Sequence, residues 1–313
     1  MTPIAVLVTG ADGQLGRALC RALHGTTRVI AAPRAALDVT DADAVRRTLR
    51  TLRPDAIVNA AAFTAVDAAE DRRDEAWAVN AIAPGILAEE AARLDAVMVH
   101  YSTDYVFDGE ARTPYTEDAP TNPLGVYGAS KLAGERAVRD AAPRSLVIRT
   151  GWLFAAHGHG FLQSMLRRAA DAEMRDTPVR VVDDRRGTPT SARWVAQATT
   201  HMVTHVCRSA TFGAWGTYHV AASGEATWHA FAGAIFANLA ARGGVVPPLQ
   251  AIPSSAYPTR ATRPAYSVLD TSRAARTFRV APASWQSQLA ETLDEQLGGA
   301  GAPDTEPLLA HRD

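Results

Sequence analysis

The sequence predicts an α/β protein built on a doubly wound parallel sheet, with a second, smaller lobe toward the C-terminus. Three observations carry this prediction. Apolar runs of strand length alternate with helical patterns through the first 150 residues, as in parallel βα units. The first run leads into a glycine-rich turn and then a helical pattern. The chain has 313 residues, enough for about two domains.

The N-terminal apolar run covers residues 4–9, and Gly10, Gly13 and Gly16 follow it. Glycines at this spacing allow a tight turn, a close approach of the backbone to a pyrophosphate, and close packing of the next helix on the strand. The free N–H groups at the start of that helix attract an anion. A purely structural turn has the same glycines, so the motif favours dinucleotide binding without establishing it.

Further strands and helices follow in alternation, and right-handed crossovers wind them into one parallel sheet with its ligands at the carboxyl ends of the strands. The chemical motifs of the chain begin at such ends. We predict strands at residues 28–31, 56–60, 96–102 and 145–150, and helices at 41–51, 66–93 and 126–141.

Tyr127 and Lys131 stand four residues apart at the start of a helical pattern, which places both side chains on one helix face. An ammonium near a phenol lowers the pKa of the tyrosine, so that it can exchange a proton with a carbonyl oxygen. The pair also occurs on ordinary helix surfaces. The strand-end motif at residues 101–107 and the glycine turn favour the catalytic interpretation.

Composition excludes several classes of protein. The 32 basic and 33 acidic residues nearly balance, so we expect no nucleic-acid partner and no membrane surface. Cys20 and Cys207 have no metal-type or redox-type neighbours and are expected to be small apolar fillers. No leader precedes the first strand, and no apolar run approaches the length of a membrane span, so we expect a cytoplasmic protein.

Four motifs resemble those of the extended short-chain dehydrogenase/reductases, at residues 10–16, 53–62, 102–109 and 127–135. Within that superfamily the chain most closely resembles the dTDP-4-dehydrorhamnose reductase family, through residues 64–70, 149–152, 187–190, 218–224 and 263–264. The match runs in order to about residue 295. It implies a Rossmann-type fold and reduction of the C4 keto group of a nucleotide sugar, dTDP-4-dehydro-L-rhamnose, by NADPH or NADH. It also allows a homodimer.

The resemblance implies three catalytic residues. Tyr127 would donate a proton to the C4 oxygen as the hydride arrives, and Lys131 would lower the pKa of Tyr127 and hydrogen-bond the nicotinamide ribose. Thr103 would donate a hydrogen bond to the same oxygen, where many members of the superfamily carry serine. An isolated threonine at a strand end more often caps a turn.

The resemblance also implies which residues contact the cofactor, namely Gly10, Gly13, Gln14, Leu15, Asp38, Val39, Ala62, Phe63, Thr64, Tyr101, Tyr127 and Lys131. Phe63 departs from the family, which often has histidine there. No carboxylate follows the second strand at positions 32 and 33, where an NADH-selective enzyme grips the ribose 2′-hydroxyl. Arg34 therefore either meets the 2′-phosphate of NADPH or projects into solvent.

Thr103, Asp104, Trp152 and Arg263 match family positions that contact the sugar nucleotide. Trp152 has a second interpretation as a core aromatic after a buried strand. Some relatives bind a divalent ion between subunits. Asp183 and Asp184 are candidates here, but Ala18 stands where the partner carboxylate would come from, so we predict no metal.

For the domains, we expect residues 1–150 to form the dinucleotide-binding domain, completed by a strand returning near residues 216–222. Residues 151–295 would form a discontinuous substrate-binding lobe. The segment 298–313 is rich in glycine and proline and is expected to be disordered.

Three alternatives share this fold. A sugar-nucleotide epimerase or 4,6-dehydratase has the same tyrosine and lysine, but dehydratases commonly follow the strand-end hydroxyl with Asp-Glu, and here Tyr105 follows Asp104. A reductase of another 4-keto sugar nucleotide is barely separable by sequence. A non-catalytic, reductase-like regulatory subunit is disfavoured by the intact Thr103, Tyr127 and Lys131.

Overall fold

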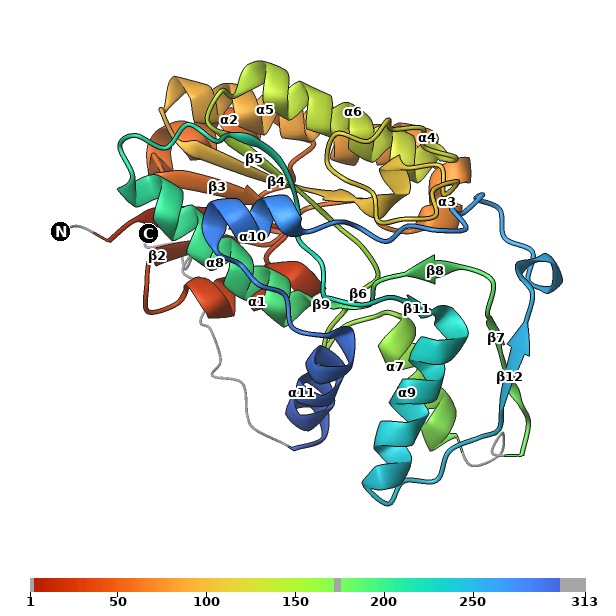
Figure 1. Ribbon diagram of the computed structural model, residues 1–313. Helices are drawn as coiled ribbons and strands as arrows, with labels where there is room; N and C mark the ends of the chain where they lie inside the picture. The colour runs from red at the N-terminus through yellow and green to blue at the C-terminus, as the bar shows by residue number, and fades with distance from the viewer. Residues whose placement is uncertain (1–2, 172–175, 299–313) are drawn as a thin grey trace.

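The computed structural model describes residues 3–171 and 176–298. A parallel sheet lies between two layers of helices, and a second, smaller group of helices and short strands packs below one end of it (Figure 1). This architecture, an open parallel sheet covered by helices on both faces, is the fold class that the sequence predicts. The segment 298–313 lies, apart from Gly298, outside the described residues.

The central sheet has six parallel strands in the order β10-β5-β4-β3-β1-β2. The chain passes from β1 to β2 on one side and then returns to place β3 on the other side of β1. The strand order therefore reverses between β1 and β3, where doubly wound sheets bind their ligands. The strands are β1 Ala5–Thr9, β2 Arg28–Ala32, β3 Ala56–Asn59, β4 Val97–Thr103, β5 Ser145–Thr150 and β10 Gly216–His219.

Helices cover both faces of this sheet (Figure 1). Successive side chains of a strand point to opposite faces, so Val6 and Val8 of β1 pack into one apolar cluster and Leu7 into the other. One face carries α1 Gln14–Leu23, α8 Ala192–Arg208 and α10 Ser272–Phe278, and the other carries α2 Ala42–Leu52, α5 Ala83–Arg93 and α6 Val126–Ala141. Continuous apolar strands are expected of a sheet covered on both faces.

Local sequence sets where these helices begin and end. The Asp41 side chain accepts hydrogen bonds from the N–H groups of Asp43 and Ala44 and so caps α2. Arg53 adopts a left-handed backbone with φ of 45°, and Pro54 follows it, so α2 ends there. The predicted helix at 126–141 coincides with α6.

The single helix predicted at residues 66–93 is wrong, because the structure breaks it into four pieces. These are α3 Val66–Asp71, α4 Arg73–Trp77, a π-helical turn Ala78–Ile82 and α5. Arg72, with φ −108° and ψ 49°, leaves helical geometry between α3 and α4. In the π-helical turn, the Asn80 side chain hydrogen-bonds both backbone groups of Phe63. The spacing of apolar residues in the sequence carries no signal of such a contact, so it does not predict the break.

The smaller group has an apolar core of its own, which includes Phe154, Phe231, Trp285 and Leu289. We infer that residues 1–150 with β10 form one domain and that most of 151–295 forms the lobe, and this separate core supports the division. The lobe contains helices α7 Phe161–Ala170, α9 Trp228–Ala241 and α11 Trp285–Leu297, and the paired strands β6 Leu153–Phe154 with β9 Thr190–Ser191, β7 Val179–Val182 with β12 Leu249–Ile252, and β8 Arg186–Gly187 with β11 Ala226–Thr227.

Within residues 3–171 and 176–298, no helix is both long and apolar enough to cross a membrane.

Candidate active site

The glycine-rich turn after β1 has the geometry of an anion-binding turn. The Gly13 N–H donates to the Gly10 carbonyl at 3.0 Å, and Gly10 has a left-handed backbone with φ of 62°. A Cβ on Gly16 would lie 2.0 Å from the Gly10 oxygen, so only glycine lets α1 pack this closely. No side chain caps α1 at Gly13, which leaves the first N–H groups of the helix for a ligand.

Gln14, the first residue of α1, connects this turn to the lobe. Its side-chain amide donates to the backbone carbonyls of His157 and His159, the latter at 2.6 Å. The loop that carries these two histidines leads into α7. Gln14 was predicted to contact the cofactor, and the structure shows that its side chain also fixes this loop beside the turn.

Asn80 is a site residue that the sequence did not predict. Its amide oxygen accepts from the Phe63 N–H at 2.9 Å, and its amide nitrogen donates to the Phe63 carbonyl at 3.0 Å. The same nitrogen donates to Ser130 of α6, and the Ser130 hydroxyl donates to the Tyr127 carbonyl. Asn80 therefore ties the segment of the predicted cofactor residues Ala62, Phe63 and Thr64 to the helix that carries Tyr127.

Tyr127 and Thr103 meet where β4 ends and α6 begins. Thr103 is the last residue of β4, and its hydroxyl donates to Asp104 Oδ1 at 3.0 Å and interacts with the Tyr127 hydroxyl. The Tyr105 ring packs edge-on against the Tyr127 ring, with centroids 6.1 Å apart. A Cβ on Gly128 would lie 2.2 Å from the Tyr105 carbonyl oxygen, so a glycine beside Tyr127 lets α6 approach the end of β4.

The pKa of Tyr127 differs from the sequence expectation. Burial of the phenol raises its pKa to about 12, and the hydrogen bond with Thr103 only partly offsets this effect. The expected lowering by Lys131 is absent in the protein alone. A high pKa keeps the proton on Tyr127 near neutral pH, and a proton donor needs that proton.

Lys131 lies one turn farther along α6 and is 2% exposed. Burial lowers the pKa of its ammonium to about 8, and the Glu135 carboxylate, another turn along, acts in the opposite direction. Glu135 itself accepts two hydrogen bonds from Arg149 of β5, at 2.8 and 2.7 Å. The buried ammonium is therefore followed on its own helix by a buried, fully paired carboxylate.

Asp104 is buried beside Thr103 and begins a short 3-10 turn, Asp104–Val106. Burial raises the pKa of its carboxyl to about 6, although hydrogen bonds with Ser267 and Thr103 act against this. The folded protein therefore holds this proton more tightly than the unfolded chain, and stability falls as pH rises from about 4 to about 6.

We expect Asp104→Asn to remove this loss of stability. At pH 8 the variant should gain up to about 3 kcal/mol in free energy of unfolding over the wild type, the equivalent of about two pKa units, and the gain should shrink toward pH 4. Urea unfolding at both pH values measures it, with Asp43→Asn in the exposed first turn of α2 as the control. A gain in free energy of unfolding that is the same at both pH values would show that the Asp104 carboxylate is not its source.

Arg34 and Asp38 lie beyond β2, where the adenosine end of a dinucleotide would reach. The Arg34 side chain is 79% exposed, and its nearest carboxylate is Asp38 at 3.6 Å. Asp38 accepts from the N–H and the hydroxyl of Thr40, and these bonds lower its pKa and order the loop. Val39, also predicted to contact the cofactor, is buried in the core under β2.

Tyr101, also predicted to contact the cofactor, has its side chain on the face of the sheet covered by α8. Its hydroxyl hydrogen-bonds Thr199 of α8 at 2.7 Å, and its ring is buried in the apolar cluster on that face of the sheet. Because α6 covers the opposite face, the phenol is held on the other side of the sheet from Lys131. Burial also raises the pKa of Tyr101, so it remains a neutral phenol.

Trp152 shows features of both interpretations that the sequence left open, a core aromatic residue and a site residue. Its ring stacks on Trp228 of the lobe with centroids 3.6 Å apart, as an aromatic core residue would. Its backbone has φ of 47°, however, which is uncommon for a residue other than glycine and is concentrated at functional sites. Trp228, which the sequence analysis missed, completes this stack.

Arg263 reaches the first domain from the C-terminal part of the chain. Its guanidinium makes a two-pronged contact with Asp67 of α3, at 2.7 and 3.1 Å. In the structure Arg263, which was predicted to contact the diphosphate of the substrate, is therefore already paired with the Asp67 carboxylate.

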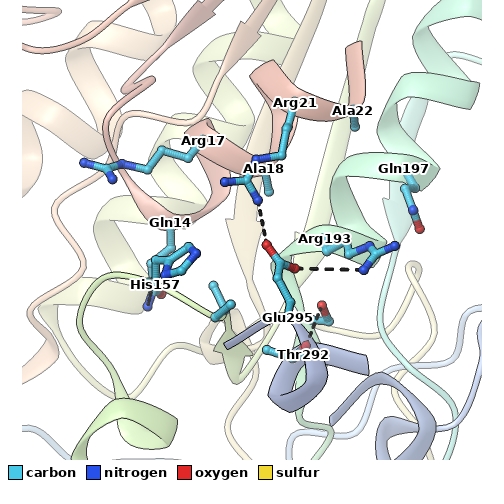
Figure 2. A pocket seen from close by; sticks show the side chains of 13 residues that line it. Gln14, Arg17, Ala18, Arg21, Ala22, His157, Arg193, Gln197, Thr292 and Glu295 are labelled. Atoms are coloured by element: carbon cyan, nitrogen blue, oxygen red, sulfur yellow. Dashed lines mark hydrogen bonds and ion pairs between the residues drawn. The ribbon is translucent and has the colours of Figure 1, made fainter. Parts of the chain in front are cut away.

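Two cavities lie near these residues. A small one is lined by Tyr127, Tyr105, Glu70, Ala261, Thr262 and Pro264, among others. A larger one of about 390 Å³ lies between α1, α8 and α11, where Arg21 and Arg193 both pair with Glu295 (Figure 2). None of Thr103, Tyr127 and Lys131 lines the larger cavity, so it is not the predicted active site.

Ala18, which motivated the prediction of no metal, lies in the wall of the larger cavity. Among the residues that the structure describes, no group of three or more His, Cys, Asp or Glu side chains is placed to hold a metal ion.

Comparison with known proteins gives a consistent result. The family model described as "RmlD substrate binding domain" matches residues 4–297. A dTDP-4-dehydrorhamnose reductase of Burkholderia thailandensis is 42% identical over 90% of this chain and 95% of its own. The crystal structure of a dTDP-4-dehydrorhamnose reductase from Clostridium acetobutylicum superposes with a TM-score of 0.87 at 34% identity, covering 94% of this chain and 100% of that one. The Bacillus anthracis enzyme, solved in complex with NADP, gives 0.84 at 31% identity with the same coverage.

Proposed function

Because the chain belongs to the RmlD substrate binding domain family, we propose that it reduces the C4 keto group of dTDP-4-dehydro-L-rhamnose to form dTDP-L-rhamnose. NADPH or NADH would supply the hydride. The observation that carries this proposal is the contact of Thr103 with Tyr127 at the end of β4, with Lys131 one turn along α6, in a chain related over nearly its whole length to reductases of this name.

The residues at the glycine turn fit a dinucleotide. The uncapped start of α1 and the close approach at Gly16 leave room and N–H donors for a pyrophosphate. When bound, the reduced nicotinamide supplies the hydride that becomes bonded to C4 of the sugar. Gly10, Gly13, Gln14 and Leu15 would hold the pyrophosphate, and Ala62, Phe63 and Thr64, after β3, would also contact the cofactor.

The protein's own residues handle the proton. The Tyr127 hydroxyl gives its proton to the C4 oxygen as negative charge develops there, and the Thr103 hydroxyl turns its one proton from Asp104 Oδ1 to the same oxygen. A sugar alkoxide is a stronger base than a phenolate, so this transfer remains favourable with the pKa of Tyr127 at about 12. The Lys131 ammonium then stabilises the phenolate that is left.

Arg34 gives a test of cofactor preference. Its guanidinium is exposed and only loosely paired with Asp38, so it is available to the 2′-phosphate that only NADPH carries. We expect Arg34→Ala to weaken NADPH binding by about 10- to 150-fold, the value of one charge-assisted hydrogen bond, with little change for NADH.

Fluorescence titration of both cofactors measures this difference, with Arg46→Ala of α2 as the matched control. Equal losses for NADPH and NADH, or no loss for either, would show that Arg34 is only a solvated surface residue.

The proposed reaction is tested by following oxidation of NADPH and NADH with enzymatically prepared dTDP-4-dehydro-L-rhamnose and identifying the product sugar. Turnover only with a different 4-keto sugar nucleotide would assign the chain to another reductase. Cofactor binding without turnover of any such sugar would favour the regulatory-subunit alternative. The homodimer and the cytoplasmic location stay predictions of the sequence, and sedimentation equilibrium measures the first.

A further inference from the structure

The short helix α3 connects two segments that are distant in sequence. Both Asp67 oxygens accept from the Arg263 guanidinium, and Oδ1 also accepts from the Ala261 N–H at 3.0 Å. One turn along the same face, Asp71 pairs with Arg260. Two ion pairs and a backbone hydrogen bond thus hold the loop of residues 260–263 on α3.

The third acidic residue of α3, Glu70, contacts helix α6, which carries Tyr127, instead of the loop. Glu70 Oε1 accepts from the Val126 N–H at 2.8 Å, at the first residue of α6 and next to Tyr127. A carboxylate at this end of a helix is favoured by the helix dipole and satisfies an otherwise free N–H group. The helix therefore holds the loop 260–263 with two acids and the start of α6 with a third.

The small cavity lies between these two attachments. Tyr127 and Gly128 of α6 line it together with Ala261, Thr262 and Pro264. Arg263 also hydrogen-bonds the phenol of Tyr105, whose ring meets the Tyr127 ring edge-on. The loop 260–263 and Tyr127 therefore line the same cavity, and a shift of the loop changes the shape of that cavity beside Tyr127.

We propose that Asp67 is a positioning residue, and that Arg263 acts through its ion pair with Asp67 rather than as a ligand of the substrate's diphosphate. The pair sets the distance between the loop 260–263 and Tyr127, and so the placement of the sugar against the proton donor. The kinetic part of this proposal rests on the proposed function. The structural part, that the pair holds the loop, does not.

Two rival arrangements make opposite predictions for one variant. If the ion pair positions the loop, Asp67→Asn lowers kcat by about 10- to 100-fold, since small misplacements of reacting groups cost that much, and changes KM little. If Arg263 leaves Asp67 to bind the diphosphate, removing the acid frees the arginine. KM then falls or stays the same, and kcat is unchanged.

Steady-state kinetics of Asp67→Asn, Arg263→Met and the double variant separate these cases. We expect both single variants to lose kcat alike and the double variant to lose no more than the worse single one, because the residues act as a pair. Asp67→Glu should stay within a few-fold of the wild type. A normal kcat in Asp67→Asn, with a KM raised tenfold or more in Arg263→Met, would overturn the proposal.

Hydrogen–deuterium exchange without any sugar nucleotide gives a readout that is independent of activity. Amides in the loop 260–263 should exchange faster in Asp67→Asn than in the wild type. Asp43→Asn is the matched control, because its ion pair with Arg46 lies within a single helix. Unchanged exchange in Asp67→Asn would show that the pair does not hold the loop, even if the protein proved to use another substrate.

Discussion

Replacing Tyr127 with phenylalanine is expected to lower kcat by about 10²- to 10⁴-fold, the usual contribution of a positioned proton donor. The phenol is the group placed to protonate the C4 oxygen, and its raised pKa keeps the proton in place until the alkoxide forms. The ring contact with Tyr105 survives the change, because phenylalanine keeps the ring. Folding and cofactor binding should therefore remain near those of the wild type.

Tyr105→Phe is the matched control, since it removes a second, half-buried phenol whose ring contacts the first. Single-turnover kinetics should show a far smaller loss for this variant than for Tyr127→Phe. Near-normal turnover in a folded Tyr127→Phe protein that still binds NADPH would reject the proton-donor assignment.

The second large effect concerns stability. Glu135→Gln should lower the free energy of unfolding by about 3–5 kcal/mol, because it leaves the Arg149 guanidinium charged, buried and without its counter-ion. Glu135 and Arg149 are 0% and 3% exposed and share two hydrogen bonds. The Phe107 ring, 5.2 Å from the guanidinium, offers only a weaker cation–π contact in exchange.

Urea unfolding at neutral pH measures this loss. Glu75→Gln provides the control, because Glu75 pairs with Arg72 at the surface, where solvent screening leaves such pairs little effect on stability. Similar losses for the two variants would contradict the role of burial. Replacing both Glu135 and Arg149 with apolar residues should recover part of the loss, because the buried guanidinium is then removed together with its partner.

Much of the first domain was predictable from sequence for a physical reason. A strand buried on both faces must be apolar along its whole length, so β1, β4 and β5 stand out as continuous runs. The glycine turn is also predictable from the sequence, because Gly16 lies so close to the Gly10 carbonyl that no larger residue fits there. Thr103 and Tyr127, proposed as site residues through the resemblance, lie at the end of β4 and near the start of α6, two elements that the sequence predicts.

Contacts between distant segments were not predictable. Asn80 looked like one polar residue in a helix, and only the fold shows that it holds both backbone groups of Phe63. The pairing of Asp67 with Arg263 joins residues 196 positions apart. The prediction of a lowered Tyr127 pKa was wrong for a different reason. The spacing of Lys131 suggested the lowering, but burial, which depends on the whole fold, raises the pKa.

The central claim is that this chain delivers a hydride to C4 of the sugar while Tyr127 delivers the proton to its oxygen. The most direct measurement uses NADPH deuterated at the transferring position of nicotinamide C4, with dTDP-4-dehydro-L-rhamnose as substrate. One deuterium is expected at C4 of the dTDP-L-rhamnose formed by the wild type, with about 10²- to 10⁴-fold slower formation of the same product by Tyr127→Phe. Product without deuterium at C4, or no product from a protein that binds both ligands, would contradict it.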